Sequence, residues 1–330
     1  MSSGILGSER LLTSHVGSFP LQHSWDNVER IAGDLAKIGI DLPPYPQMRS
    51  FIDMYLEPLV EAGLLVKKGS STYHADPKRL LDSRPPRVVA PEAELAARLR
   101  SRLGFRWMRG PATGPFTLAS RVYVSEGQGL SATALANQDL VTGFFAEYVR
   151  GVVESLVFLG YDFIVIDEPM LANIVGRRVL LYGYSPEDVL ETYHRILGPA
   201  KGRLRGTHVC GRLPHRLPEI LAESPDLDVL NHEFADSRAN LEIEWRRILE
   251  ASGKTLSPGI LSSKKPVVET VEQAEQLLEA VASKAGWENI NIVSADCGFA
   301  ALSSSAGPEE AYRIGLEKLG VLVELARRRA

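Results

Sequence analysis

The two cysteines of the sequence both follow short apolar runs rich in β-branched residues. His208 precedes Cys210 by two residues, so their side chains point the same way in an extended segment. Cys297 ends a later run of the same kind, and Glu233 lies near the end of a third. Imidazole nitrogen, thiolate sulfur and carboxylate oxygen are the ligands that zinc favours. We therefore predict a zinc site made of His208, Cys210, Glu233 and Cys297.

Each of these residues also has an ordinary structural explanation. A lone buried cysteine is usually a small hydrophobic residue, and Glu233 alone could cap a helix or pair with a cation. The metal site is favoured because both cysteines lie at strand ends and one stands beside His208. We expect His232 to be a packed or solvated neighbour of Glu233. The remaining histidines without visible partners are expected at the surface: His23, His74, His194 and His215.

Two further apolar runs end in polar clusters, one from His15 to Ser18 and one from Asp167 to Pro169. Either cluster alone could be explained by turn chemistry. In a parallel barrel, however, the carboxyl ends of the strands converge on one face, where barrel enzymes place their active sites. We therefore expect both clusters to share that face with the zinc ligands.

The elements that would position these residues alternate between strands and helices, which is typical of a parallel sheet with helical crossovers. Apolar runs predict strands at Leu11–Gly17, Phe105–Gly110, Phe163–Asp167, Leu204–Cys210, Val229–Phe234, Thr255–Leu261 and Ile290–Ala295. Apolar residues at three- and four-residue spacing predict helices at Trp25–Ile38, Pro46–Leu65, Thr133–Leu159, Pro186–Leu197, Val267–Ala285 and Pro308–Ala326.

An eighth strand could lie between Ile40 and Val89, where the pattern is irregular. Eight strands would close a (β/α)8 TIM barrel, and the length of 330 residues suits that fold with some decoration. We predict an α/β chain in which residues 1–330 form this single catalytic domain, with an irregular insertion at about 40–95. An open doubly wound sheet is the competing architecture.

The composition excludes several classes of protein. Charged residues make up 24% and hydrophobic residues 45% of the chain, which is ordinary globular usage and not disorder. The net charge of −4 makes nucleic acid an unsuitable partner. No stretch is long and apolar enough for a membrane span, and the N-terminus lacks the pattern of a secretory signal. Two cysteines do not make a disulfide framework, so we expect a cytoplasmic protein with reduced thiols.

Several motifs together resemble one family, the cobalamin-independent methionine synthases. Its zinc motifs are similar to His208-Val209-Cys210, to Glu233 followed by Ser237-Arg238, and to Asp296-Cys297-Gly298. Its homocysteine-binding strand, Ile-Asp-Glu-Pro segment and Gly-Pro-x-Thr turn resemble Val16 to Pro20, Ile166 to Pro169 and Gly114 to Thr117. The resemblance spans nearly the whole chain in order, but it covers only the family's C-terminal catalytic barrel.

The resemblance implies a zinc-dependent methyltransferase that methylates the thiol of homocysteine to form methionine. Zinc would deprotonate a thiol that otherwise titrates near 8.5. The aspartate of the family's Ile-Asp-Glu-Pro segment holds the homocysteine amino group, so the resemblance implies this role for Asp167. The substrate-binding residues that the resemblance implies are Val16, Gly17, Ser18, Gln47, Asp167 and Glu168.

Four positions depart from the folate-dependent members of the family. Arg121 stands where those enzymes carry a tryptophan against the pterin, and Asn173 replaces a folate-binding glutamate. Gln47 replaces a homocysteine-binding glutamate, and Lys264 falls where a catalytic histidine is expected. Lys264 is therefore the only candidate catalytic residue that we can name. The segment around Glu233 resembles the short archaeal-type members, for which methylcobalamin or a methylated corrinoid protein is the implied donor.

Three alternatives stay open at this point. The chain could be a methyltetrahydrofolate-dependent homocysteine methyltransferase, or a corrinoid-dependent methyltransferase for another thiol such as coenzyme M. It could also be a module that stores metal or binds a corrinoid without turnover. Glu233 as a fourth ligand, with residues 16–20 and Asp167 suited to an amino acid, favours homocysteine as substrate.

Overall fold

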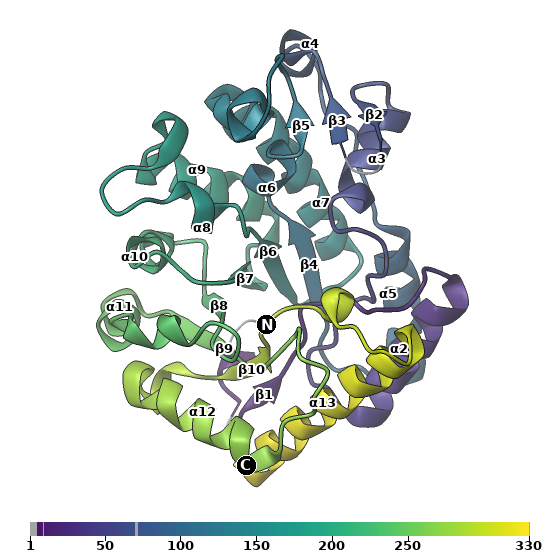
Figure 1. Ribbon diagram of the computed structural model, residues 1–330, viewed down its shortest axis with the longest axis vertical. Coiled ribbons are helices and arrows are strands. Elements are labelled where there is room, and N and C mark those ends of the chain that lie inside the picture. Colours follow the sequence, from purple (N-terminus) through teal and green to yellow (C-terminus); the bar gives the residue numbers. More distant parts are fainter. Residues whose placement is uncertain (1–4, 9, 70–71, 330) are drawn as a thin grey trace.

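The computed structural model describes residues 5–8, 10–69 and 72–329, and a parallel sheet forms its centre (Figure 1). The described part of the chain forms seven strands of this sheet, in the order β1-β10-β9-β8-β7-β6-β4. Its strands are β1 (Leu12–Thr13), β4 (Arg109–Thr113), β6 (Phe163–Asp167), β7 (Leu204–Val209), β8 (Val229–Glu233), β9 (Thr255–Leu261) and β10 (Ile292–Ala295). The predicted α/β fold with a parallel sheet is therefore confirmed.

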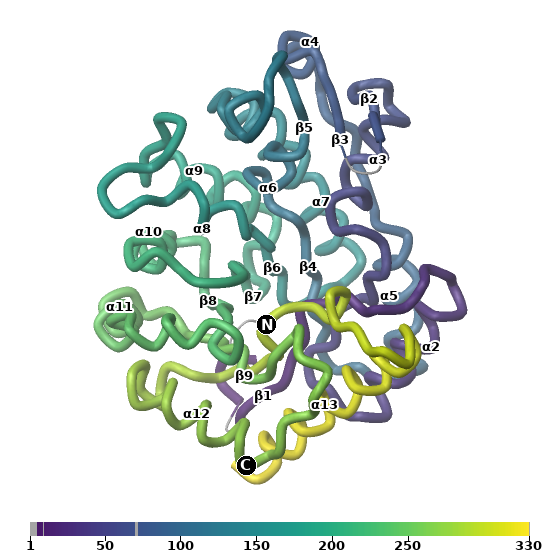
Figure 2. Tube along the Cα trace, in the orientation of Figure 1, coloured from purple at the N-terminus to yellow at the C-terminus, as the bar shows by residue number. Residues whose placement is uncertain are grey.

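Helices cover the outer face of the sheet, as the ribbon and the chain trace both show (Figures 1 and 2). They are α2 (Trp25–Ile38), α3 (Asp53–Glu61), α4 (Pro77–Leu81), α5 (Pro91–Leu103), α6 (Pro115–Ala119), α7 (Ala146–Phe158), α8 (Leu171–Ile174), α9 (Pro186–Leu197), α10 (Arg216–Glu223), α11 (Trp245–Ser252), α12 (Val271–Ala285) and α13 (Pro308–Arg328). The N-terminal and C-terminal parts of the chain are in contact where α2 lies beside α13, joined by Arg30–Glu309 and by Tyr312–Asp34.

The predicted helix boundaries hold where the sequence carries capping residues. Helix α9 begins at Pro186 because Ser185 and Asp188 form a reciprocal capping box. Helix α12 begins at Val271 and not at the expected Val267, because Thr270 accepts a hydrogen bond from the Gln273 amide and fixes the start.

Between β1 and β4, where the eighth strand was expected, the chain forms single bridges instead of a ladder. Leu42 forms a parallel bridge with Ser14, and Pro44 forms one with Arg109. Prolines at positions 43, 44 and 46 have no N–H to donate, so this segment cannot form a regular ladder. The described sheet thus curls as a half-barrel, with segment 42–47 crossing the space between its two outer strands.

Four other predicted elements are wrong in their extent. The expected strand Leu11–Gly17 is only the two residues of β1. The expected helix Pro46–Leu65 is only α3, because the prolines keep the chain before it extended. The expected strand Phe105–Gly110 is displaced to β4, since the chain leaves α5 through the left-handed Gly104. The expected helix Thr133–Leu159 is divided into 3-10 turns, a π-helix at Leu140–Phe145 and then α7.

A small second sheet was not predicted. It joins β2 (Val66–Lys68), β3 (Thr72–His74) and β5 (Val122–Tyr123) in the order β2-β3-β5, near α4 at the top of Figure 1. The region at 40–95 therefore carries short elements of its own, and β5, from outside that range, pairs with one of them.

The inner face of the main sheet is apolar at the amino ends of its strands. A separate cluster of buried side chains fills this end: Ile5, Leu12, Leu42, Phe163, Val165, Leu204, Val229 and Ile292. Polar side chains lie closer to the carboxyl ends of the strands, beyond this packed apolar cluster. No helix in the described part of the chain has the length and apolar character that crossing a membrane requires.

Candidate functional site

Two strand ends bring a histidine and both cysteines together. His208 lies in β7, Cys210 directly follows that strand, and Cys297 follows β10 after one residue. His208 Nε2 is 3.0 Å from Cys210 Sγ, which is 3.1 Å from Cys297 Sγ. One ligand atom of each residue lies within 4.8 Å of the other two. Both cysteines are free, so this is a cluster of one imidazole and two thiols that could hold a metal ion.

The donor types and spacing of this cluster fit zinc. Ligand bonds of about 2.0–2.3 Å in a tetrahedron would hold neighbouring donor atoms roughly 3.5 Å apart. The observed separations of 3.0 and 3.1 Å would need only a small outward movement of the sulfurs. The hydrogen bond from Cys210 holds the pKa of the Cys297 thiol well below its usual value. Burial opposes this effect, and His208 adds to it. A thiolate is thereby favoured at the position where a cation would bind.

Glu233 lies beside the cluster, at the end of β8, and is buried. Its Oε2 accepts a hydrogen bond from Ser237 Oγ at 3.2 Å and lies 3.9 Å from Lys264 Nζ. Burial and the charge of Cys297 raise the pKa of this carboxyl, while Lys264 opposes them. The structure thus groups three of the four predicted ligands closely and leaves the ligand role of Glu233 a prediction.

Asp296 fixes the loop that follows Glu233. Its Oδ1 accepts hydrogen bonds from the amides of Phe234 and Ala235, both at 2.9 Å, and its Oδ2 accepts one from Asp236. Burial raises the pKa of Asp296 to about 7, against the effect of these three bonds. Asp296, the residue before Cys297, therefore fixes the position of the chain that follows Glu233.

His232 faces away from the cluster. Its ring packs against Trp245 at a centroid distance of 5.7 Å, and its Nδ1 lies 3.3 Å from the Val209 carbonyl oxygen. Burial lowers its pKa to about 3, so it is neutral. The expectation that His232 is a packed neighbour is confirmed by these contacts. Two of the histidines expected at the surface have carboxylate partners: His23 pairs with Glu92 and His194 with Asp226.

Asn240 was missed by the sequence analysis. Its side chain donates to the carbonyl oxygens of Gly211 at 3.0 Å and Glu233 at 2.7 Å, and it accepts from the Leu213 amide. It thereby ties the loop after Cys210 to the end of β8. Nothing in the sequence pattern marked it, because its partners are backbone groups far along the chain.

The predicted substrate segment 16–18 lies against the loop that follows Cys297. The Phe299 amide donates to the Ser18 carbonyl oxygen at 2.7 Å, and the Ala300 amide donates to Ser18 Oγ at 3.3 Å. A side chain at Gly298 would collide with Ser18, so this close approach requires glycine. The structure therefore brings Ser18 next to a cysteine of the cluster.

Gln47 is buried on the other side of the same segment. Its amide donates to the Gly17 carbonyl oxygen at 2.9 Å, and its own carbonyl accepts from the Phe19 amide at 2.8 Å. Its side-chain nitrogen donates to Tyr45 Oη at 3.1 Å. Gly17 has a φ of 137°, which favours glycine at this turn. Gln47 is thus joined by backbone hydrogen bonds to the segment that contains residues 16–18.

The neighbours Asp167 and Glu168 have different surroundings. Asp167 Oδ1 is buried without a hydrogen-bond partner, and burial raises its pKa to about 6. Glu168 is fully occupied: it accepts from the Phe116 amide at 2.6 Å and from Thr117 Oγ1 at 2.7 Å. Glu168 therefore holds the Gly-Pro-Phe-Thr turn, whereas Asp167 has an oxygen free for a ligand. The substrate role of Glu168 stays a prediction.

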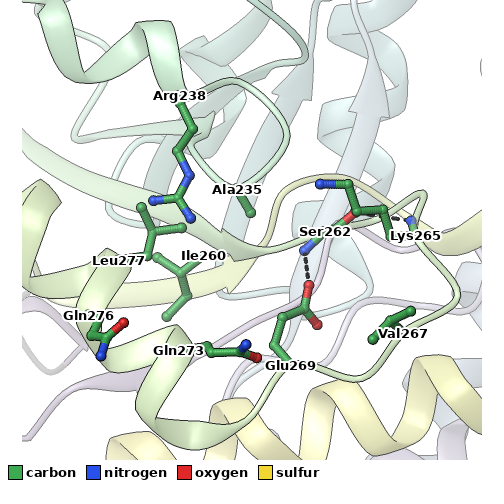
Figure 3. Close-up of a pocket in the computed structure, with 10 residues that line it drawn as sticks. All are labelled: Ala235, Arg238, Ile260, Ser262, Lys265, Val267, Glu269, Gln273, Gln276 and Leu277. Atoms are coloured by element: carbon green, nitrogen blue, oxygen red, sulfur yellow. Dashed lines mark hydrogen bonds between the residues drawn. The ribbon is translucent and has the colours of Figure 1, made fainter.

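Three of the four residues that depart from the folate-dependent pattern are exposed, whereas Gln47 is buried. Arg121 and Asn173 are exposed, and the Asn173 side chain donates to the Pro169 carbonyl oxygen at 3.3 Å. Lys264 is 59% exposed. The next residue, Lys265, lines a cavity of about 380 Å³ together with Ser262, Glu269 and other residues (Figure 3). Figure 3 shows Glu269 accepting the Ser262 amide across the loop, at 2.8 Å. His208, Cys210 and Cys297 are not among the residues that line this cavity.

Comparison with known proteins identifies the family of this chain. A family model described as the catalytic domain of the cobalamin-independent synthases matches residues 92–312. The methionine synthase of Methanocaldococcus jannaschii is 25% identical over 280 residues, covering 82% of this chain and 83% of that protein. The methionine synthase of Methanothermobacter marburgensis is also 25% identical, over 89% of this chain and 88% of its own length.

Solved structures show the same fold. A B12-independent methionine synthase from Shewanella sp. W3-18-1, in complex with selenomethionine, superposes with a TM-score of 0.69 at 16% identity, covering 97% of this chain and 98% of that chain. A methyltransferase from Methanosarcina mazei superposes with a TM-score of 0.66 at 16% identity, covering 99% and 97%. Because the family model matches most of the chain, the protein belongs to the cobalamin-independent methionine synthase family, through its catalytic domain, and is an enzyme of the methyltransferase class.

Proposed function

We propose that the protein is a zinc-dependent methyltransferase that transfers a methyl group to the thiol of homocysteine and forms methionine. The observation that carries the proposal is the meeting of His208, Cys210 and Cys297 within 4.8 Å of one another, next to Ser18. Family membership supports the reaction, and the residues around the cluster suit an amino-acid thiol.

His208, Cys210 and Cys297 would hold the zinc ion, with Glu233 as the fourth ligand. Zinc would supply Lewis acidity that lowers the pKa of a substrate thiol toward neutrality. Around it, Asp296 keeps Glu233 in place through the amides of residues 234–236. The free thiols suit a reducing compartment, so we also propose a cytoplasmic location.

Asp167 would recognise the substrate ammonium group. It offers a buried oxygen that no protein donor satisfies, and its neighbour in the sheet is His208. Ser18 and Gln47 would line the same pocket from the opposite side. Coenzyme M carries no ammonium group and would leave Asp167 unpaired, which favours homocysteine over that thiol.

The methyl donor that we propose is methylcobalamin, free or on a corrinoid protein. Arg121 and Asn173 are exposed, and by resemblance they offer a cation and an amide at positions where a pterin would need an aromatic face and a carboxylate. In the transfer, the methyl carbon bonds to the substrate sulfur while the cobalt–carbon bond breaks. Both electrons of that bond stay on cobalt, so the leaving group needs no proton. Methyltetrahydrofolate is the competing donor.

We also propose that the sheet is a (β/α)8 barrel in which segment 42–47 takes the place of the eighth strand. The bridges from Leu42 to Ser14 and from Pro44 to Arg109 support this closure. A closed barrel would hold Gln47 and Asp167 on the same face as the cysteines.

The decisive experiment is a donor comparison with purified, zinc-loaded protein and homocysteine. Methionine formation with methylcobalamin, faster than with methyltetrahydrofolate at matched concentration, is the expected result. Methionine formation with the folate alone would replace the donor but keep the reaction. No methionine with any donor, together with no zinc retained after dialysis, would refute the proposed function.

A further inference from the structure

A buried arginine lies beside Asp167, the sheet neighbour of His208, and no hydrogen bond within the described residues accounts for its charge. Arg109 is the first residue of β4, and its side chain is 0% exposed. Its guanidinium lies 5.7 Å from the centre of the Phe163 ring, so its long side chain runs along the inner face of the sheet. The charged group ends near the carboxyl ends of the strands, where its Nη2 is 3.9 Å from Asp167 Oδ1.

This guanidinium has no hydrogen-bond partner on any of its three nitrogens among the described residues. The nearest carboxylate oxygen, Asp167 Oδ1, lacks a hydrogen-bond partner as well. Removing a cation from water without such partners is costly, so the protein must gain from keeping it there. An unsatisfied buried cation of this kind indicates an anionic group that is present only in the working enzyme.

The charges around Arg109 show where that anion would be. Burial lowers the pKa of Arg109 to about 10, while Asp167, Cys297 and Cys210 oppose the shift. The neighbouring His15 is neutral, because burial and the charge of Arg109 lower its pKa to about 3. His15 is held between the rings of Phe19 and Phe299, and its two nitrogens are also unpartnered. Arg109 is thus a buried cation beside Asp167, and Asp167 is the sheet neighbour of His208 in the cluster of possible metal ligands.

We propose that Arg109 is a positioning residue whose charge stabilises the bound substrate thiolate and thereby makes the site prefer the substrate over the methylated product. This proposal rests on the function proposed above. It gives Arg109 the role of distinguishing homocysteine from methionine at the same site.

The charge balance of the site explains the preference. Two thiolates and one carboxylate already exceed the charge of a zinc ion, and a substrate thiolate adds one more negative charge to a buried place. Methyl transfer forms the carbon–sulfur bond and leaves the donor with its electron pair, so the sulfur becomes a neutral thioether. Homocysteine and methionine share the ammonium and carboxylate groups, and differ at this site mainly in the charge on sulfur. A fixed buried cation therefore distinguishes them.

Loss of the Arg109 charge should affect KM and kcat differently. The sulfur loses negative charge as the reaction proceeds, so Arg109 stabilises the bound thiolate more than the transition state. Removing it should raise KM for homocysteine while kcat stays the same or rises. A residue that only supported the fold would lower kcat as well.

The test compares the affinities of zinc-loaded protein for homocysteine and methionine by calorimetry. Arg109→Met should weaken homocysteine roughly ten- to hundredfold and change methionine by less than about threefold. Arg109→Lys, which keeps the charge, should recover most of the preference. The matched control is Arg205→Met, because Arg205 is also on a sheet strand but pairs with Asp226 and Asp228.

Each outcome decides the proposal. Equal weakening of both ligands in Arg109→Met, or an unchanged ratio, would overturn it. If Arg109→Met does not fold, Arg109→Gln is measured in the same way, and the ratio of the two affinities again decides. A wild-type protein that binds neither ligand would instead refute the proposed function, which separates the two failures.

Discussion

The two sides of the site are built on different kinds of backbone. On the metal side, β7 pairs in a continuous parallel register with β6 and β8, and His208 and Cys210 stand at its end. On the amino-acid side, β1 has two residues and segment 42–47 is held by single bridges. Regular ladders hold side chains in positions fixed by alternation, whereas bridges leave the position to individual contacts.

This difference shows which contacts each side depends on. The metal side needs the spacing of His208 and Cys210, which is local, and one distant residue, Cys297. The amino-acid side depends on close approaches such as Gly298 to Ser18 and on the hydrogen bonds between Gly17 and Gln47. We therefore expect substitutions on the metal side to remove a ligand outright, and those on the other side to alter affinity by degrees.

The largest effect is expected from breaking the metal side directly. Cys297→Ser replaces a thiolate with a hydroxyl that is a poor zinc ligand at neutral pH, and we expect zinc affinity to fall about 1,000-fold or more. Metal analysis after dialysis against a chelator, together with the methyl-transfer rate, would measure this. Full zinc retention in the variant would contradict the ligand assignment.

Removing the support of that side should have a smaller effect. Asp296→Ala leaves the amides of residues 234–236 without their acceptor, so the chain beside Glu233 would lose its fixed position. We expect a 10- to 100-fold loss in zinc affinity, the usual range for outer residues of a metal site.

A competition titration with a chromophoric chelator measures this loss. Asp228→Ala is a control, since Asp228 accepts the Arg205 amide at the opposite end of the strands. Equal losses in the two variants would indicate general destabilisation and would remove the specific role of Asp296.

The sequence predicted more of the metal side than of the amino-acid side, for a physical reason. His208 and Cys210 share a face because strand alternation is local, and the capping box at Ser185 fixes a helix start within four residues. The bridging role of segment 42–47 depends on tertiary contacts around three prolines. Its irregular sequence pattern therefore predicted only that an eighth strand could lie somewhere between Ile40 and Val89. Asn240 was missed because its partners are backbone groups, which leave no pattern in the sequence. Arg109 was overlooked although the sequence did mark it, as a charged residue inside a predicted strand whose two faces must both be covered.

The amino-acid side can be tested through Asp167. Asp167→Asn should weaken homocysteine roughly ten- to hundredfold through loss of a charge-assisted contact with the ammonium, and should leave zinc in place. Calorimetry with homocysteine and a zinc analysis measure both properties. Unchanged affinity would exclude Asp167 as the ammonium acceptor.

The pH dependence gives an independent measure of the same residue. Burial raises the pKa of Asp167 from 3.8 to about 6, so its carboxylate is lost as the pH falls through about 6. Methionine is the suitable ligand, because it carries the ammonium without a titrating thiol. We expect its affinity to be full above this pH and to fall below it in the wild type. In Asp167→Asn the affinity should be low and flat over the same range.

The smallest effect is expected at the rim, where Lys264 approaches the metal side from solvent. Its ammonium is 3.9 Å from Glu233 Oε2 but the side chain is 59% exposed, and exposed ion pairs contribute about 0–1 kcal/mol. Lys264→Met should therefore change zinc affinity by no more than about fivefold.

The effect of Lys264→Met on turnover depends on the methyl donor. A folate leaving group needs a proton from a positioned acid, whereas cobalt(I) needs none, so the variant should keep nearly full activity with methylcobalamin. Rates measured with both donors check this, and a large loss with methylcobalamin would give Lys264 a direct role that its exposure does not suggest.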